Sequence, residues 1–260
     1  VKRNPYTLEH IENPSEDIML EAVRRNGMVL QYIKNPPLNV AEAAIENEAR
    51  AIQFLSDPPA DLAKKAICKS WANLEYIHNP SRELITTALS YSGWAIKYVR
   101  DPDEALQLEA VKKNFDAVKY IDNPSQEIQE AAAAQSYAAL RYIDDPVFSA
   151  EALAVKNDEQ ALRFIKNLTT EKFISLFKIN SLILKYMPPN FAIAVDAVED
   201  ALRQVIGSEE VDEKYIRDLL NNHSIGRTVS TMPIDVIALI DEYGSPKARR
   251  ITVDEKLKFT

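Results

Sequence analysis

The sequence has few of the residues that several classes of protein depend on. Its 260 residues include one cysteine, five glycines and three histidines. The single cysteine, Cys68, excludes an intramolecular disulfide and suits a reducing compartment. So few glycines argue against a turn-rich β fold and against a glycine-rich phosphate loop. No apolar run approaches about 18 residues, so we expect no membrane span. The first residues lead into no apolar segment of the kind found in a signal peptide, so we expect no signal peptide either.

Residue patterns that support catalysis or metal binding are also scarce. The three histidines, His10, His78 and His223, lie far apart and have no histidine or cysteine partner at metal-ligand spacing. Cys68 has only Lys69 as a positive neighbour, which is typical of a passive thiol. We find no serine nucleophile elbow and no paired-carboxylate motif. The sequence therefore predicts no enzyme activity, no metal and no cofactor.

The overall charge is mildly acidic. The net charge is −8, from 31 lysines and arginines against 39 aspartates and glutamates spread along the chain. This balance disfavours a general nucleic-acid binder. Hydrophobic residues make up 46% and charged residues 27%, as in ordinary globular proteins. With no targeting segment, the composition predicts a cytoplasmic protein.

The strongest positive signal is a repeat of 22 residues. Asparagine or aspartate directly before proline recurs seven times at this step, at Asn13, Asn35, Asp57, Asn79, Asp101, Asn123 and Asp145. Alanine follows each of these prolines by eight residues, at Ala22, Ala44, Ala66, Ala88, Ala110, Ala132 and Ala154. An aromatic residue followed by an aliphatic one keeps the same step, from Tyr32-Ile33 to Phe164-Ile165. Such regular spacing indicates one supersecondary unit used many times.

Each repeat is predicted to form two short helices. The asparagine or aspartate is expected to cap the first helix, with proline at the first helical position and, in some repeats, a capping box such as Asn13 with Glu16. The alanine column indicates a close helix–helix crossing. After a polar break, a second helix places Leu30 and Ile33 on one side. Because such helices cannot bury their apolar faces alone, we predict an all-α solenoid of about eight two-helix repeats.

The repeat decays after Lys166. We predict a helical-repeat solenoid over residues 1-187 and a C-terminal helical cap, or a small helical domain, over 188-260. Helices are expected over 191–206, capped by Asn190, over about 208–222 and over 233–243, with the first of them docked on the last repeat. The tail over 247–260 is expected to be loose, with Ile251-Thr252-Val253 as a candidate strand. Self-association, which would give a homo-oligomer, is an alternative role for this segment.

The repeat motif resembles a known family. Asn-Pro-Ser-x-Glu/Gln-Ile, Ala-Val-Lys-x-Asn and Ala-Val-Lys-Tyr-Ile, as they occur between Leu108 and Ile143, are similar to short helical repeats of bacterial and bacteriophage proteins. That family is called domain of unknown function 4116. The resemblance covers about residues 5 to 187 and implies a helical-repeat scaffold in a bacterial or phage protein. It implies no catalytic residue.

Aromatic residues outside the core columns are the first candidate site. Trp71, Phe115 and Tyr137 share one repeat position, Trp94 lies one residue later in its own repeat, and Tyr91 is nearby. Exposed aromatic side chains of this kind are typical of binding hot spots. The alternative interpretation is that they cover the groove between repeats.

A column of cations is the second candidate. The position that holds Gln31, Gln53 and Glu75 in early repeats holds Lys97, Lys119, Arg141 and Arg163 in four later ones. We call these four cations the basic ladder. They could engage an acidic peptide or a phosphate chain, or they could be the solvated side of a helix.

These observations predict a non-catalytic scaffold that binds a protein or peptide partner. In a phage setting it would be an adaptor or an inhibitor of a host protein in the host cytoplasm. The alternative is a nucleic-acid or acidic-peptide binder that uses the Lys97–Arg163 ladder, with a strong dependence on salt. For a third class, an enzyme in the C-terminal segment, we find no set of residues.

Overall fold

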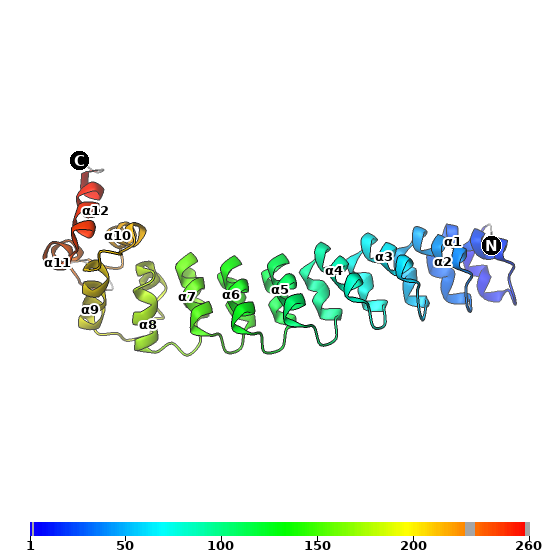
Figure 1. Cartoon of the computed structure of the whole chain (residues 1–260), viewed down its shortest axis with the longest axis horizontal. Coiled ribbons are helices and arrows are strands. Elements are labelled where there is room, and N and C mark those ends of the chain that lie inside the picture. The colour runs from blue at the N-terminus through cyan, green and yellow to red at the C-terminus, as the bar shows by residue number, and fades with distance from the viewer. Residues whose placement is uncertain (2, 227–231, 258–260) are drawn as a thin grey trace. The chain divides into compact units, whose positions relative to one another are not determined.

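A computed structural model describes residues 1, 3–226 and 232–257, and it divides the chain into two compact units, residues 1–123 and 124–260. Within these described ranges the secondary structure is helical, apart from one isolated bridge between Ile225 and Met232. Helix pairs follow one another in chain order, and α1 to α5 lie side by side in the first unit (Figure 1). The predicted all-α repeat solenoid is confirmed.

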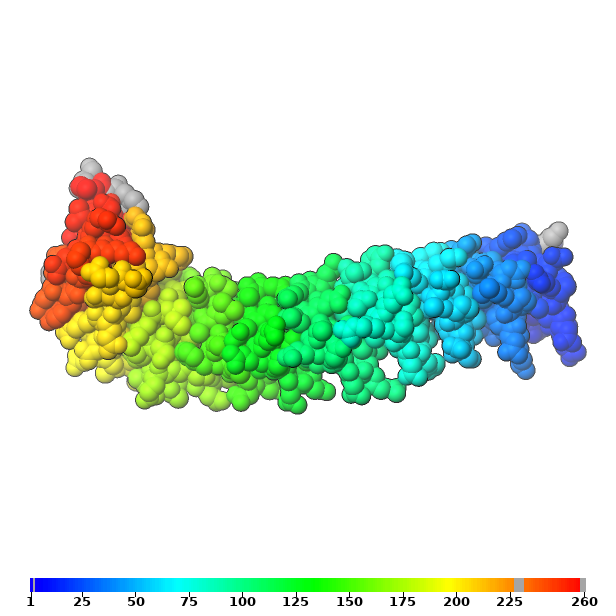
Figure 2. Space-filling view, in the orientation of Figure 1, coloured from blue at the N-terminus to red at the C-terminus, as the bar shows by residue number. Residues whose placement is uncertain are grey.

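The first unit begins with a single 3-10 helix and continues with α-helices that alternate with 3-10 helices. Its elements are η1 (Pro5–His10), α1 (Glu16–Arg25), η2 (Gly27–Tyr32), α2 (Leu38–Asn47), η3 (Ala49–Phe54), α3 (Ala60–Lys69), η4 (Trp71–Tyr76), α4 (Arg82–Tyr91), η5 (Gly93–Tyr98), α5 (Glu104–Lys113) and η6 (Phe115–Tyr120). The helix η1 is an additional half-repeat, in which buried Leu8 takes the place of Leu30. Successive repeats form neighbouring bands from blue to cyan in the space-filling view (Figure 2).

The second unit contains three further repeats and four helices that do not repeat. Its elements are α6 (Gln126–Gln135), η7 (Tyr137–Tyr142), α7 (Phe148–Asn157), η8 (Glu159–Phe164), α8 (Thr170–Phe177), η9 (Ser181–Tyr186), α9 (Val195–Ile206), α10 (Glu213–Leu220), α11 (Val236–Tyr243) and α12 (Pro246–Leu257). The decayed eighth repeat, α8 with η9, still folds as a helix pair.

The second helix of every repeat is a 3-10 helix rather than an α-helix. A 3-10 helix has three residues per turn, so side chains three positions apart lie directly above one another. The third and fourth residues of each such helix point inward, as Val29 and Leu30 do in η2. The helix is often capped locally, since the side chains of Asn26, Ser92 and Asn180 each accept a hydrogen bond from the backbone two residues later.

The predicted role of the asparagine or aspartate before proline is wrong. The N-cap lies two residues later and the α-helix begins at the third. Ser81, Asp103 and Ser125 are N-caps whose side chains accept a hydrogen bond from the third residue after them. The predicted capping box of Asn13 with Glu16 is therefore absent, because Ser15 is the N-cap and Glu16 the first helical residue. Five of the residues before proline, and Asn167 at the equivalent position of the eighth repeat, instead have φ between 48° and 55°. Asparagine and aspartate adopt this left-handed conformation more readily than other side chains, which explains their presence in the turn.

The alanine column lies at the closest contact between repeats. All seven alanines are fully buried, and the carbonyl oxygens of Ala44 and Ala110 approach the start of the preceding 3-10 helix. A β-carbon on Gly27 would lie 2.3 Å from the first of these oxygens, and one on Gly93 would lie 2.1 Å from the second. In the aliphatic column four residues after proline, Val40 is buried whereas Ile18 of the first repeat is 37% exposed.

The C-terminal helices differ in detail from the prediction. The helix α9 begins at Val195 with Ala194 as N-cap, not at Phe191 after Asn190, and α10 begins after Asp212 rather than near Ser208. The tail is not loose and forms no strand, because it folds as α12 up to Leu257. Its inward side mixes apolar and polar residues, Ala248, Ile251, Thr252 and Glu255, which hid the helical period from the sequence analysis. Residues 258–260 of the predicted tail lie outside the described residues.

These helices share one apolar core with the last repeats, as predicted for the helix over 191–206. Phe191 packs on Phe173 of α8 with ring centroids 5.4 Å apart. The hydroxyl of buried Tyr215 in α10 donates to the carbonyl of Phe177 at 3.1 Å. Inside the same core lie Val198, Leu202 and Ile216. The boundary between compact units falls after Asn123, within the repeats, and the predicted domain boundary at 187/188 stays a prediction.

Candidate interaction surface

The aromatic residues of η4 and η5 form a cluster in the first unit. The rings of Trp71 and Trp94 meet edge to face with centroids 6.5 Å apart, and the ring of Tyr98 lies 6.3 Å from that of Trp71. Trp71 and Tyr98 are half-buried, whereas Trp94 is 39% exposed. Trp71 is the first residue of η4, and Trp94 and Tyr98 are the second and the last residues of the neighbouring η5. Trp71 and Trp94 therefore lie beside each other, and their role in binding stays a prediction.

Two lysines of the basic ladder lie on this cluster. The Lys97 ammonium is 4.4 Å from the ring centroid of Tyr98 and 5.9 Å from that of Trp71. The Lys119 ammonium is 5.3 Å from the ring centroid of Trp94 and 5.0 Å from that of Tyr120. All four distances suit cation–π attraction. We call Trp71, Trp94, Lys97, Tyr98, Lys119 and Tyr120 the aromatic face.

A carboxylate neutralises part of this face. Asp116 accepts hydrogen bonds from the indole N–H of Trp94 at 2.7 Å and from the Lys119 ammonium at 3.0 Å. Burial acts to raise the pKa of Asp116, but these hydrogen bonds outweigh it and lower the pKa. The same bond raises the pKa of Lys119, and a hydrogen bond with Tyr98 raises that of Lys97. Trp94 is thus held in place by a charged partner while its ring remains accessible.

Two other predicted aromatic residues stand apart from this cluster. Tyr91 is 52% exposed at the end of α4. A hydrogen bond with Cys68 raises its pKa, so its hydroxyl faces the preceding α-helix. Phe115 is half-buried at the start of η6, and in the described part of the chain no ring contact joins it to Trp71. Sharing a repeat position was therefore not sufficient to bring Phe115 into the cluster.

The equivalent surface of the second unit contains arginine in place of lysine. The half-buried ring of Tyr137 lies 5.7 Å from that of Phe164. The Arg141 guanidinium is 5.2 Å from the centroid of Phe164, and the Arg163 guanidinium is 4.6 Å from that of Tyr186. All four ladder residues are exposed, and each one lies over an aromatic ring.

The column of ladder cations has one further member, which was not predicted. Lys185 follows Arg163 by 22 residues and is exposed at the same position of η9. The signal was present in the sequence, because Leu184 and Tyr186 already matched the repeat there. The loss of proline and alanine in the eighth repeat obscured it.

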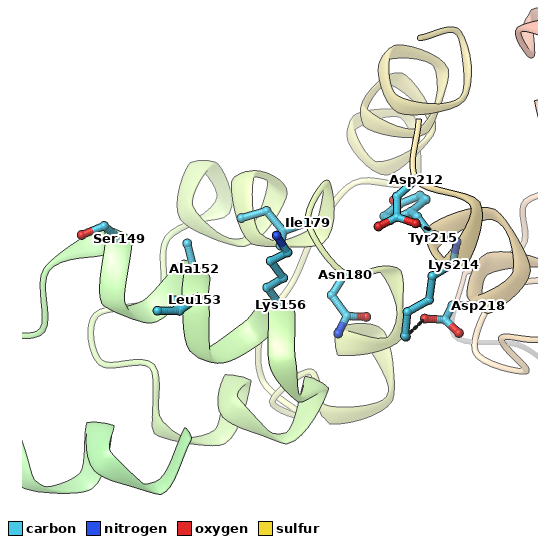
Figure 3. Close-up of a pocket in the computed structure, with 10 residues that line it drawn as sticks. All are labelled: Ser149, Ala152, Leu153, Lys156, Ile179, Asn180, Asp212, Lys214, Tyr215 and Asp218. Atoms are coloured by element: carbon cyan, nitrogen blue, oxygen red, sulfur yellow. Dashed lines mark hydrogen bonds and ion pairs between the residues drawn. The ribbon is translucent and has the colours of Figure 1, made fainter. Parts of the chain in front are cut away.

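A cleft of about 570 Å³ opens within the second unit between α7 and α10 (Figure 3). Ala152, Leu153 and Ile179 supply apolar walls, and Lys156 projects toward the opening. On the opposite wall Lys214 pairs with Asp218. Asp212 caps α10 and Asn180 bonds to backbone, so these polar groups serve the fold.

The residues considered as metal ligands or as a nucleophile lie at the surface. His10, His78, His223 and Cys68 are all exposed. Over the described ranges, no three histidine, cysteine or acidic side chains gather as they would around a metal ion. Likewise, none of the described helices has the length and apolar character needed to cross a bilayer.

The C-terminal helix α12 exposes two apolar residues. Val253 and Leu257 lie one turn apart, in the segment for which self-association was considered.

Comparison of the chain with protein-family models, with curated proteins and with solved structures finds no match.

Proposed function

We propose that this protein is a non-catalytic interaction module that binds a protein or peptide partner on its aromatic face. The observation that supports this most is the cluster of Trp71, Trp94 and Tyr98, which is ordered by ring contacts yet remains partly accessible. Tryptophan, tyrosine and arginine are the residues most often found at binding hot spots. A large apolar ring that is fixed before binding loses little conformational entropy when a partner covers it.

These rings lie only partly within the fold. Trp71 and Tyr98 pack against the core of the first unit but keep part of their surface exposed, whereas Trp94 is exposed. Trp94 also replaces residues as small as Ala72 at its repeat position. A bulky aromatic residue at such a position is better explained by contact with a partner than by packing.

In the phage setting that the repeat resemblance implies, such a module would act as an adaptor or as an inhibitor of a host protein in the host cytoplasm. The partner would need a surface patch that covers an apolar ring of the aromatic face and accepts hydrogen bonds from its lysines. A patch of apolar groups flanked by carboxylates has both properties.

Affinity capture with a matched pair of variants tests the proposal. The Trp94→Ala variant removes the exposed ring, and the Leu38→Ala variant removes a side chain that is 56% exposed on α2, away from the aromatic face. We expect wild type and Leu38→Ala to retain the same partner, as identified by mass spectrometry, and Trp94→Ala to lose it. Equal retention by both variants would refute the assignment of the face. A wild-type protein that retains no partner would refute the module itself.

A further inference from the structure

The arginines of the second unit lie over aromatic rings. The guanidinium carbon of Arg141 is 5.2 Å from the ring centroid of Phe164, and that of Arg163 is 4.6 Å from the ring centroid of Tyr186. Cation–π attraction to the ring restricts each arginine. A guanidinium carries five N–H donors and binds a carboxylate or a phosphate through two parallel hydrogen bonds.

These cations also lack the counter-charge found in the first unit. Lys119 has Asp116 one 3-10 turn before it, and the two form an ion pair. The residues one turn before Arg141, Arg163 and Lys185 are Ala138, Gln160 and Leu182, none of which carries a charge. Among the residues that the structure describes, these three cations make no ion pair, and nearby Asp144 pairs with Lys166 instead. Three successive repeats thus present positive charge without a local partner.

The spacing of the cations suits an extended peptide. Neighbouring helices in a stack are separated by about 8–10 Å, so one cation follows another at roughly that distance. A polyproline II segment rises about 3.1 Å per residue with three residues per turn, which gives about 9 Å per turn. A carboxylate at every third residue of such a segment would meet one cation per repeat.

A nucleic acid fits this surface less well. Each strand of a duplex carries one phosphate per about 3.4 Å of helix axis, so most of the phosphates would have no cation opposite. The chain as a whole carries a net charge of −8 and would repel a long polyanion at distances beyond the ladder. A short peptide with widely spaced carboxylates avoids both problems.

We propose that Arg141, Arg163 and Lys185 bind an acidic peptide segment in an extended conformation, with aspartate or glutamate at every third residue. This inference rests on the proposed role as an interaction module and adds a second recognition surface with a defined chemistry.

The test uses the full-length protein and a fluorescent peptide of four Glu-Pro-Pro repeats, with binding followed by anisotropy at low and high salt. One control peptide replaces glutamate with glutamine, and another gathers the same four glutamates at one end. The protein variants are Arg163→Gln and Arg250→Gln. They remove the same charge from the same unit, but Arg250 is an exposed residue of α12 outside the ladder. Circular dichroism melting establishes that both variants are folded.

We expect the regular acidic peptide to bind wild type and Arg250→Gln alike, and to bind Arg163→Gln about fivefold more weakly or worse. The glutamine peptide should not bind, the clustered peptide should bind more weakly than the regular one, and salt should weaken binding. Equal affinity for wild type and Arg163→Gln would overturn the site, and equal affinity for the two acidic peptides would overturn the proposed register. A single-stranded oligonucleotide that binds more tightly than the peptide and is lost in Arg163→Gln would assign the ladder to nucleic acid.

The two proposals fail separately. Loss of partner capture in Trp94→Ala concerns the aromatic face of the first unit, whereas the peptide assay concerns the arginines of the second. A negative result in the peptide assay with a retained effect of Trp94→Ala would leave the interaction module standing and remove only this inference.

Discussion

The two units contain the same repeat, but they differ in the side chains that their 3-10 helices expose to solvent. In the first unit, lysines lie on a tryptophan–tyrosine cluster, and Asp116 balances part of their charge. In the second, arginines lie on single rings of Phe164 and Tyr186 and face neutral neighbours. The first surface offers mainly apolar area, and the second offers mainly hydrogen-bond donors. One repeat architecture thereby provides two kinds of recognition chemistry, because the residues at these surface positions vary between repeats.

The units also differ in how their cores are built. The core of the first unit consists of repeat columns with Leu8 at its N-terminal end. The core of the second continues from the repeats into α9, α10, α11 and α12 without a break. The last repeats in the second unit therefore depend on a non-repeating partner, whereas each repeat in the first depends on others of its kind.

Truncation after Pro189 should have the largest effect. It removes the helices that cover Phe173 and Phe177, both fully buried, and so exposes apolar surface that favours aggregation. We expect the truncated chain to elute from a sizing column as aggregates. Both tryptophans lie in the first unit, so their emission should stay native if that unit remains folded. A monomeric truncated chain with unchanged thermal stability would show that the C-terminal helices form an independent module.

Substitution at the closest contact between repeats should come next. The Gly93→Ala variant places a β-carbon against the carbonyl of Ala110, and Ala110→Leu overpacks the same contact, at a cost of about 1–3 kcal/mol each. The matched variant in the second unit is Gly226→Ala, whose new carbon has no neighbour within 4 Å. Denaturant unfolding should show a lower free energy of unfolding for Gly93→Ala and Ala110→Leu than for Gly226→Ala. Equal stability of Gly93→Ala and Gly226→Ala would mean that the repeats do not pack as closely as described.

The pH dependence of stability distinguishes a buried carboxylate of the second unit. Burial raises the pKa of Glu151, although its ion pair with Lys172, at 2.9 Å, acts in the opposite direction. The folded protein then holds the proton more tightly than the unfolded chain, so this contribution to stability is complete at low pH and is lost as the pH rises through the raised pKa.

The Glu151→Gln variant should remove that loss. Gln129, one repeat earlier, shows how glutamine fits the position, because it donates to the carbonyl of Pro124 and accepts from the backbone of Val147. We expect the variant to gain about 1 kcal/mol relative to wild type at pH 8 and less at pH 5 in thermal melts. The control is Glu127→Gln, at an exposed glutamate, and it should leave the stability at pH 8 and at pH 5 unchanged. A variant that is less stable at pH 8 would show that the ion pair with Lys172 outweighs the cost of burial.

The smallest effect is expected from the cations themselves. Lys97→Gln and Arg163→Gln each remove a cation from a ring, at an expected cost near 0.5 kcal/mol at these exposed positions. The two variants should therefore be equally stable in chemical denaturation while only Arg163→Gln weakens binding of the acidic peptide. A much larger loss of stability in either one would assign that cation to the fold rather than to recognition.

Much of the fold was predictable from the sequence because it depends on columns that repeat. The period, the two helices of each repeat and buried positions such as Ala88 and Ile96 follow from spacing alone. The helix starts were misplaced because Asn-Pro satisfies the rules for a cap as well as those for a left-handed turn, and only geometry separates the two. The helix α12 was missed because its buried side includes Thr252 and Glu255, whose burial depends on contacts with α10 that are distant in sequence.

The candidate site was less predictable. The shared position of Trp71 and Phe115 suggested a common surface, but only Trp71 joins a ring cluster, since Trp94 and Tyr98 of the following repeat supply it. The cation–π contacts of the ladder were also absent from the prediction. They require knowledge of the twist between neighbouring 3-10 helices, which determines which ring lies under which cation.

Tryptophan fluorescence tests the central claim most directly. The protein has two tryptophans, and both belong to the aromatic face, so their emission reports on that face with no label. Titration with the captured partner should shift the emission to shorter wavelengths and reduce quenching by acrylamide as the Trp94 ring is covered. Saturable binding of the partner, measured by calorimetry under the same conditions, with no change in emission or in quenching would contradict the assignment of the aromatic face.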